Sequence, residues 1–266
     1  MTQRSMISTL CGALILAALV GRPAAASKFS YDDWNKVLSK YVNDKGMVNY
    51  EGLAKDRAEL DRFVAAIEKT SPKSNPEFFP TKNDKLAYYL NAYNAHVFKG
   101  VLSRGPEKES VWSGGLLGGT GYKFFAGMDI LIGGEKTHLK TLEDKTIREN
   151  FKDPRVHAAL NCASKGCPRL PQTAFDPEKL DAQLDAGMTE FVAEKRNVTI
   201  DDATKTVKLS KIFEWFSGDF VAYEKAHGDA AGNQIAYVNR YRGSLPKVPP
   251  GDKIKFFEYD KSINKQ

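Results

Sequence analysis

The sequence predicts an α+β protein made of a single domain, in which a buried central helix packs on a small, mainly antiparallel sheet. Segments with apolar residues at helical spacing alternate with short segments that have the features of strands. The stretch 85–102 is apolar on nearly every side, which is typical of a buried helix. About 240 residues follow an N-terminal leader, enough for one sizeable core, and no linker divides them.

Residues 1–26 have the pattern of a cleaved signal peptide. Arg4 supplies the positive charge, residues 10–20 are apolar, and Ala24-Ala25-Ala26 supplies the cleavage site. The apolar run is far shorter than the ~20 residues that a membrane-spanning helix needs. We therefore expect cleavage after Ala26, a periplasmic or secreted location, no integral membrane segment after cleavage, and a single domain over residues 27–266.

The charge of the chain argues against a nucleic-acid partner. Loss of Arg4 and Arg22 with the leader lowers the formal net charge from +6 to +4. Lysines are spread along the chain instead of forming one basic patch, a distribution that favours solubility. The expected partner is a small-molecule or peptide ligand of unknown identity.

Helices are predicted where apolar residues recur at helical spacing. The segments 31–41 and 58–69 each have one apolar face, and Asn83 or Asp84 caps the helix 85–102. Acidic residues favour a helix start at the beginning of 141–151. The remaining helices begin at Asp176-Pro177, follow the capping residue Ser210, and span residues 235–241.

Strands are predicted where short apolar stretches are bounded by turn residues. The predicted strands cover 122–126 and 128–132, a return strand 136–139 after the turn Gly133-Gly134, a hairpin of 198–200 and 206–209, and a last strand 253–259.

Two asparagines stand out on the predicted buried helix. Asn91 and Asn94 are three residues apart and therefore neighbours on its surface. A buried amide without partners costs ~1–3 kcal/mol, so both side chains are expected to bind something close by. That partner is either the backbone of a loop or a substrate.

The chemistry of the chain is concentrated in the stretch 155–170, which contains His157, Asn161, Cys162 and Cys167. Its apolar and polar residues alternate at first, which predicts a strand. The strand then breaks in a tight loop at 163–166, before a proline that cannot donate to a sheet.

The chain resembles the family known as domain of unknown function 547, found in bacteria and plants. The resemblance is carried by KLAYYLNAYNA (85–95), DPRVHAALNCASKGCPRL (153–170), LSKIFEWF (209–216) with Asp219-Phe220, and EYDKSIN (258–264). The segment LKTLED (139–144) is similar to a helix of the family, but Asp144 stands where histidine is common. Lys261 stands where tryptophan is common. The resemblance implies a shared fold and leaves the chemistry open.

Three interpretations compete for the two cysteines. In an oxidising compartment, Cys162 and Cys167 are expected to form a disulfide that closes a short loop and contributes roughly 2 kcal/mol. Alternatively, Cys162 is a thiolate nucleophile. A metal site is the third interpretation, but Cys-x4-Cys lacks the compact spacing of structural zinc sites, so no metal is expected.

The nucleophile interpretation needs a base and a group that orients it. His157 is nearest in sequence, but five residues separate it from Cys162, so a regular strand would place them on opposite faces. The pair works only if the strand ends near Leu160 or contains a bulge. His96 and His138 are alternative bases, with the orienting group drawn from Glu143, Asn91 and Asn94. By analogy, such a site is reminiscent of papain-like or transglutaminase-like enzymes.

Other reactive patterns are excluded. Ser164 lacks the Gly-x-Ser-x-Gly context of a hydrolase nucleophile. The glycine-rich stretch 113–121 lacks the Gly-Lys-Ser/Thr ending of a phosphate loop, so no nucleotide and no other cofactor is expected.

The sequence thus favours a thiol-dependent hydrolase or acyl transferase acting on an amide-like bond. Its predicted catalytic residues are Cys162, His157, Glu143 and Asn91, and its predicted binding residues are Asn94, Asn161 and Cys167. The alternative is a non-catalytic binding or scaffold domain held by a Cys162–Cys167 disulfide.

Overall fold

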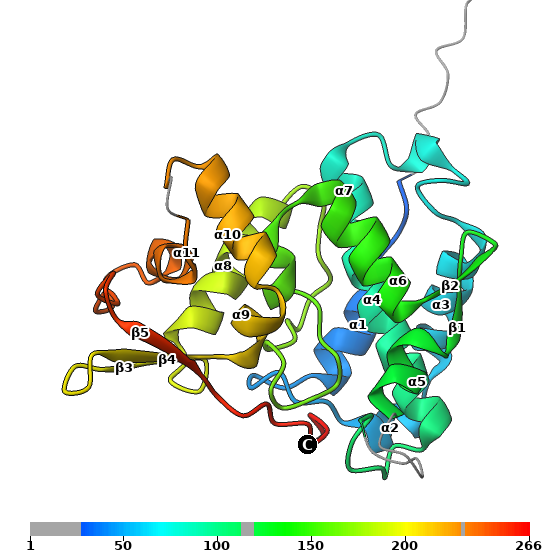
Figure 1. Ribbon diagram of the computed structural model, residues 1–266. Coiled ribbons are helices and arrows are strands. Elements are labelled where there is room, and N and C mark those ends of the chain that lie inside the picture. The colour runs from blue at the N-terminus through cyan, green and yellow to red at the C-terminus, as the bar shows by residue number, and fades with distance from the viewer. Residues whose placement is uncertain (1–27, 113–119, 230–231) are drawn as a thin grey trace, which may run out of the picture.

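The computed structural model describes residues 28–112, 120–229 and 232–266. The predicted signal peptide and most of the glycine-rich stretch lie outside these residues. Within them the chain is mostly helical, with two small sheets, so the predicted α+β class is confirmed (Figure 1). No helix among these residues is both long enough and apolar enough to cross a bilayer.

The central helix is α4 (Lys82–Arg104), and its middle is buried on all faces. The elements packed around it are α2 (Tyr50–Lys55), α3 (Ala58–Lys69), α6 (Leu139–Thr141) and the π-helical segment η2 (Leu142–Arg148). The prediction that Asn83 or Asp84 is the N-cap is wrong. Thr81 caps the helix, and its backbone N–H donates to the Asp84 carboxylate in a capping box, so α4 begins earlier.

The first sheet is the predicted hairpin of β1 (Asp129–Ile132) and β2 (Glu135–His138). It lies against α3, because the backbone N–H groups of its turn glycines donate to carbonyls at the end of that helix. The strand predicted over 122–126 is wrong, since these residues belong to α5 (Thr120–Ala126). Phe124 and Phe125 are adjacent and both buried, which a helix packed on the core allows and a one-faced strand does not.

The second sheet has the order β3 (Val198–Asp201), β4 (Thr206–Leu209), β5 (Lys253–Phe256). The β3–β4 pair is the predicted antiparallel hairpin, and β5 runs parallel to β4. Figure 1 shows this sheet beside the helices α8 (Leu180–Ala193), α9 (Lys211–Trp215), α10 (Ser217–Ala226) and α11 (Gln234–Tyr241). The other described elements are α1 (Asp32–Tyr41), η1 (Pro76–Phe78), α7 (Glu149–Phe151) and η3 (Pro154–Ala158).

The cysteine segment lies between two apolar cores. Val156 and Leu160 belong to the core around α4, whereas Ala158 belongs to the core formed by α8, α11 and the second sheet. The cysteine loop is thus held by both cores at once.

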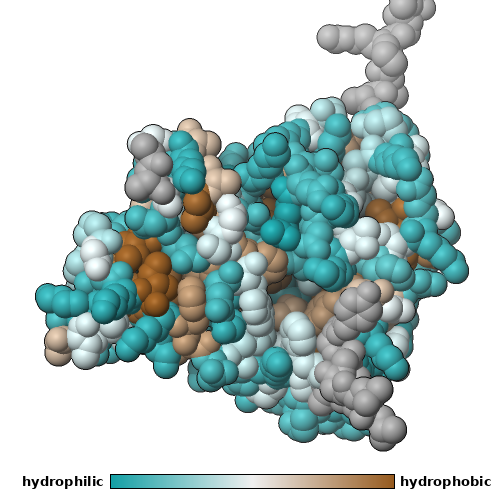
Figure 2. Space-filling model, in the orientation of Figure 1, coloured by the Kyte–Doolittle hydropathy of each residue, from teal (hydrophilic) through white to brown (hydrophobic). Residues whose placement is uncertain are grey.

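On the face shown in Figure 2 the surface is mostly hydrophilic, with apolar residues gathered in a few patches.

The predicted strand at the start of this segment is wrong. Residues Pro154–Ala158 form a 3-10 helix, and the chain continues as a loop to the cysteines. Pro154 presets the helical backbone, and the Asp153 side chain accepts a hydrogen bond from the Arg155 N–H at 3.0 Å. This local capping outweighs the alternating pattern. The argument that a regular strand would place His157 and Cys162 on opposite faces therefore does not apply.

His96 on α4 gives the fold a predicted pH dependence. It is 1 % exposed, and its Nε2 has no hydrogen-bond partner among the described residues. Burial, with Lys99 adding to it and Glu68 opposing it, lowers the pKa of His96 to about 4. Because the unfolded chain binds a proton at His96 more readily than the folded chain does, the stability of the fold depends on pH. The stability that neutral His96 provides is complete above pH ~6.5 and is lost as the pH falls to 4.

The expected loss is about 3 kcal/mol between pH 7 and pH 4. Replacing His96 with Leu should remove it. Urea unfolding of both proteins at the two pH values measures the difference. An equal pH dependence in the two proteins would show that His96 does not titrate in this way.

Candidate functional site

A cavity of about 170 Å³ lies where the two cores meet, between η2, η3, the cysteine loop and α9. Six of its lining residues are tyrosine, tryptophan or phenylalanine. Its polar lining brings together three of the predicted catalytic residues, His157, Glu143 and Cys162, with Cys167 beside them. This is the candidate site.

The two cysteines form a disulfide, with their Cα atoms 6.2 Å apart. Cys162 is partly exposed, whereas Cys167 is only 2 % exposed. The hydroxyl of Tyr259, just after β5, lies 2.9 Å from the Cys162 Sγ and 3.1 Å from the Cys167 Sγ. Cys162 is therefore the more exposed residue of the pair, and the Tyr259 hydroxyl contacts both sulfurs.

The predicted binding residues Asn94 and Asn161 hold the cysteine loop. The Asn94 amide donates to the Ala159 carbonyl at 3.0 Å and accepts from the Asn161 N–H at 3.0 Å. The Asn161 amide in turn donates to the Pro168 carbonyl at 2.7 Å. All of these groups are buried, so the position of Cys162 is set by amide hydrogen bonds from α4.

Asn91 does not line the cavity. Its side chain donates to the Phe175 carbonyl at 2.8 Å and accepts from the Phe175 N–H at 3.0 Å. Both ends of the amide are used by a loop backbone. The structure therefore places Asn91 apart from the other three predicted catalytic residues.

His157 is oriented by Asp219, at the start of α10. The His157 Nε2 lies 2.8 Å from an Asp219 carboxylate oxygen, and its ring stacks on Phe216 with centroids 4.0 Å apart. Burial lowers the pKa of His157, and the bond to Asp219 opposes this. A neutral imidazole held in one orientation by a carboxylate is the arrangement required of a general base.

Asp219 is a site residue that was not predicted from the sequence. Although burial raises it, the hydrogen bonds from His157 and Arg148 hold the pKa of Asp219 well below its usual range, so the group is a carboxylate at neutral pH. Arg148 donates to it at 2.7 Å. Its position in one of the segments that resemble the family was the available signal, because spacing alone does not link residues 157 and 219.

Glu143 on η2 is a separate acid–base group. The Tyr93 hydroxyl donates to its carboxylate at 3.3 Å. Burial and, to a smaller extent, the negative charge of Asp144 raise the pKa of Glu143 to about 7, although the positive charges of Arg148 and Lys140 act in the opposite direction. The negative charge of Glu143 also helps to raise the pKa of Tyr259, so Glu143 interacts electrostatically with the residue whose hydroxyl contacts both sulfurs. Glu143 therefore faces the cavity without orienting His157.

The alternative bases lie elsewhere. His96 is buried in α4 against the backbone of β1. The His138 Nδ1, at the end of β2, is 3.3 Å from the Met128 carbonyl. Neither residue lines the cavity with Cys162.

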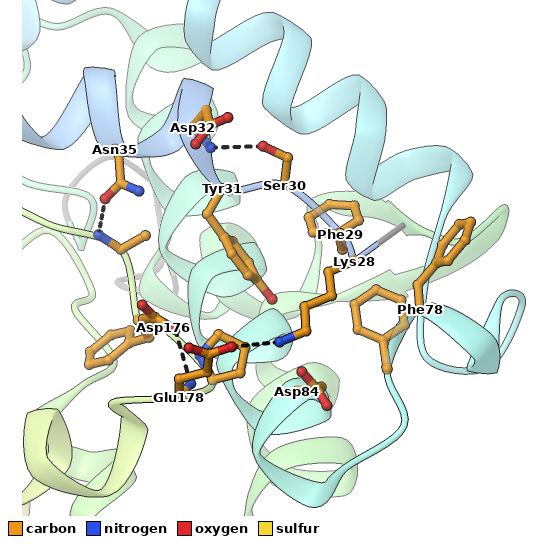
Figure 3. A pocket seen from close by; sticks show the side chains of 14 residues that line it. Lys28, Phe29, Ser30, Tyr31, Asp32, Asn35, Phe78, Asp84, Asp176 and Glu178 are labelled. Carbon is orange, nitrogen blue, oxygen red and sulfur yellow. Dashed lines mark hydrogen bonds and ion pairs between the residues drawn. The ribbon is translucent and has the colours of Figure 1, made fainter. Parts of the chain in front are cut away.

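A second cavity, of about 380 Å³, lies beside the first described residues (Figure 3). The Lys28 ammonium reaches the Glu178 carboxylate across it, at 2.6 Å. The buried Asp84 serves the capping box of α4, and Asp176 accepts from the Glu178 N–H. These carboxylates already have partners in the fold, so this cavity is a weaker candidate for a site.

Among residues 28–112, 120–229 and 232–266, no group of three or more His, Cys, Asp or Glu side chains is arranged to hold a metal ion.

Comparison with known proteins identifies a matching family model. No curated protein and no solved structure matches the chain. The family model matches residues 78–192, a segment that includes α4, η2, η3, the cysteine loop and all of α8 but its last residue. This segment contains Cys162, His157 and Glu143. Asp219 and Tyr259 lie beyond it. The resemblance predicted from the sequence is confirmed: residues 78–192 match the family described as "Protein of unknown function, DUF547".

Proposed function

We propose that this protein is an exported thiol enzyme that breaks or transfers an amide-like acyl group, and that the Cys162–Cys167 disulfide is its resting form. Cys162 is the nucleophile and His157 the base. Asp219 orients His157, a role predicted from the sequence for Glu143 or Asn91. The location outside the cytoplasm follows from the signal-peptide pattern of residues 1–26.

One observation carries the proposal: His157, which Asp219 holds through a 2.8 Å contact to Nε2, lines the same cavity as Cys162, the more exposed of the two cysteines. The Nε2 of His157 is committed to Asp219, so Nδ1 is the nitrogen left to accept the thiol proton. The unequal exposure of the two cysteine residues also fits, because a substrate must reach the nucleophile and need not reach its disulfide partner.

The chemistry begins with reduction. A dithiol reductant gives two hydrogens to the disulfide, leaving two thiols on the protein and a disulfide on the reductant. His157 then accepts the Cys162 proton, and the thiolate attacks the acyl carbon. The imidazolium returns the proton to the leaving amine, which leaves a thioester on Cys162. Tyr259, whose hydroxyl contacts both sulfurs, is placed to donate to the thiolate.

Alkylation of Cys162 tests the proposal. At about pH 6.5 an ordinary thiol of pKa ~8.5 reacts slowly with iodoacetamide, whereas an activated thiolate reacts quickly. We expect no labelling without reductant and rapid labelling with it, assigned to Cys162 by peptide mass spectrometry. Cys167→Ser should give rapid labelling without reductant, because it frees Cys162.

His157→Ala is expected to slow the labelling, on the order of ten- to a hundredfold, because the base is lost. His138→Ala is the matched control, since this histidine lies outside the cavity. Reduced Cys162 that reacts no faster in the parent than in His157→Ala would rule out thiol activation by His157.

The second candidate function is a binding domain in which the disulfide only fixes the loop, and the presence of the bond favours it. In that case the reduced protein carries ordinary thiols, and the disulfide contributes roughly 2 kcal/mol of stability by restricting a short loop. Slow alkylation of the reduced, folded protein, together with a lower urea midpoint, would support this function over catalysis.

A further inference from the structure

The mouth of the site cavity is built from three aromatic rings. The ring centroids of Trp215 and Tyr259 are 4.7 Å apart, and Trp112 lies 6.4 Å and 6.3 Å from them. Trp215 is 44 % exposed, and the only other large apolar side chain so exposed in the described part of the chain is Leu245. An exposed tryptophan beside a reactive group points to ligand contact.

The charged groups in and next to the cavity differ in their partners. Lys140 donates to Asp144 at 2.6 Å, and Arg148 donates to both Asp144 and Asp219. Those cations are already engaged by carboxylates. Glu143, in contrast, is bonded to the neutral Tyr93 hydroxyl. The cavity therefore combines aromatic faces with a carboxylate that is hydrogen-bonded to no cation among the described residues.

This combination is complementary to a ligand ammonium group. A cation is attracted to the face of tryptophan or tyrosine, most strongly when it is partly desolvated, and Glu143 adds a full or partial negative charge. The protein already uses the same attraction at the outer rim, where the Lys261 ammonium lies 5.8 Å from the Trp112 ring centroid. The volume of about 170 Å³ suits an alkylamine group and not a folded segment.

We propose that the cavity binds a primary alkylammonium group, such as the end of a lysine side chain, and presents it as the acyl acceptor. This inference rests on the proposed thiol chemistry, and it makes acyl transfer to an amine the preferred outcome over hydrolysis. Glu143 takes one proton from the ammonium, and the neutral amine attacks the thioester carbon. As the C–N bond forms and the C–S bond breaks, His157 takes the second proton and Cys162 leaves as a thiolate.

Binding is tested on the oxidised protein, so that it does not depend on the thiol. Two of the three tryptophans, Trp112 and Trp215, line the cavity and Trp34 is buried in the core, so tryptophan fluorescence reports on the site. We expect n-butylammonium chloride to change the emission saturably and the neutral n-butanol to have no such effect. Glu143→Gln and Trp215→Ala should each weaken binding at least tenfold.

Glu149→Gln is the matched control for the charge change, because Glu149 is an exposed carboxylate on α7 that pairs with Lys145 outside the cavity. It should bind like the parent. Equal binding of butanol and butylammonium, or unchanged affinity in Glu143→Gln, would overturn the ammonium site.

Acceptor chemistry is tested on the reduced protein with p-nitrophenyl acetate and n-butylamine. A burst of p-nitrophenol reports acylation of Cys162 and so tests the thiol proposal by itself. The ratio of N-butylacetamide to acetate then tests the acceptor. We expect Glu143→Gln to lower this ratio at least tenfold and Glu149→Gln to leave it unchanged. A burst with an unchanged ratio would overturn the acceptor role alone, whereas no burst would overturn the thiol proposal.

Discussion

Replacing Asp219 with Asn is expected to slow alkylation of reduced Cys162 at about pH 6.5, on the order of ten- to a hundredfold. The carboxylate is 2.8 Å from the His157 Nε2 and is held in its charged form by His157 and Arg148. Without it, the imidazolium that forms when His157 accepts the thiol proton loses its stabilising charge. The pKa of Cys162 should then return toward the ~8.5 of an ordinary thiol.

The rate of alkylation as a function of pH is the measurement that isolates this effect. In Asp219→Asn the midpoint should move to higher pH, a change that simple loosening of the fold would not produce. Asp185→Asn is the control, because Asp185 is an exposed carboxylate on α8 that accepts a hydrogen bond from Arg155 and does not line the cavity. A parent-like pH profile in Asp219→Asn would show that Asp219 does not act through His157.

Local sequence signals predicted the elements that depend on one strong periodicity. The helix over 58–69 was predicted correctly from its one apolar face, and the hairpin around Gly133-Gly134 from its turn signal. The strand predicted over 122–126 was wrong because an apolar run this short does not distinguish a strand from a buried helix. Tertiary packing of Phe124 and Phe125 decides it.

The strand predicted at the start of the cysteine segment was wrong for a different reason. The alternation in 155–160 satisfies the pattern of a strand, but Asp153 and Pro154 form a helix start just before it. Two local rules competed, and capping prevailed. The geometric relation of His157 to Cys162 could not be predicted once the secondary structure was wrong.

The candidate site was predictable in part. Cys162, His157 and Glu143 were predicted from residue type and position, and the structure brings them to one cavity. Asp219 lies 62 residues after His157, which it orients, and Tyr259 lies 97 residues after Cys162, which it contacts. Local sequence patterns do not reveal contacts at such separations. The buried helix predicted that Asn91 and Asn94 bind something close by, but not that only Asn94 holds the cysteine loop.

Asn94→Leu is expected to cost about 2–6 kcal/mol of the free energy of unfolding. The substitution orphans two buried backbone groups, the Ala159 carbonyl and the Asn161 N–H, and each costs ~1–3 kcal/mol when left without a partner. Asn150→Leu is the control, because that amide is exposed on α7 and water can replace its bonds, so a change within ~0.5 kcal/mol is expected. Urea unfolding measures both variants. Since the same two bonds set the position of the cysteine loop, Asn94→Leu should also slow alkylation of reduced Cys162 in the folded protein. A denaturation midpoint equal to that of the parent would mean that the loop is held without Asn94.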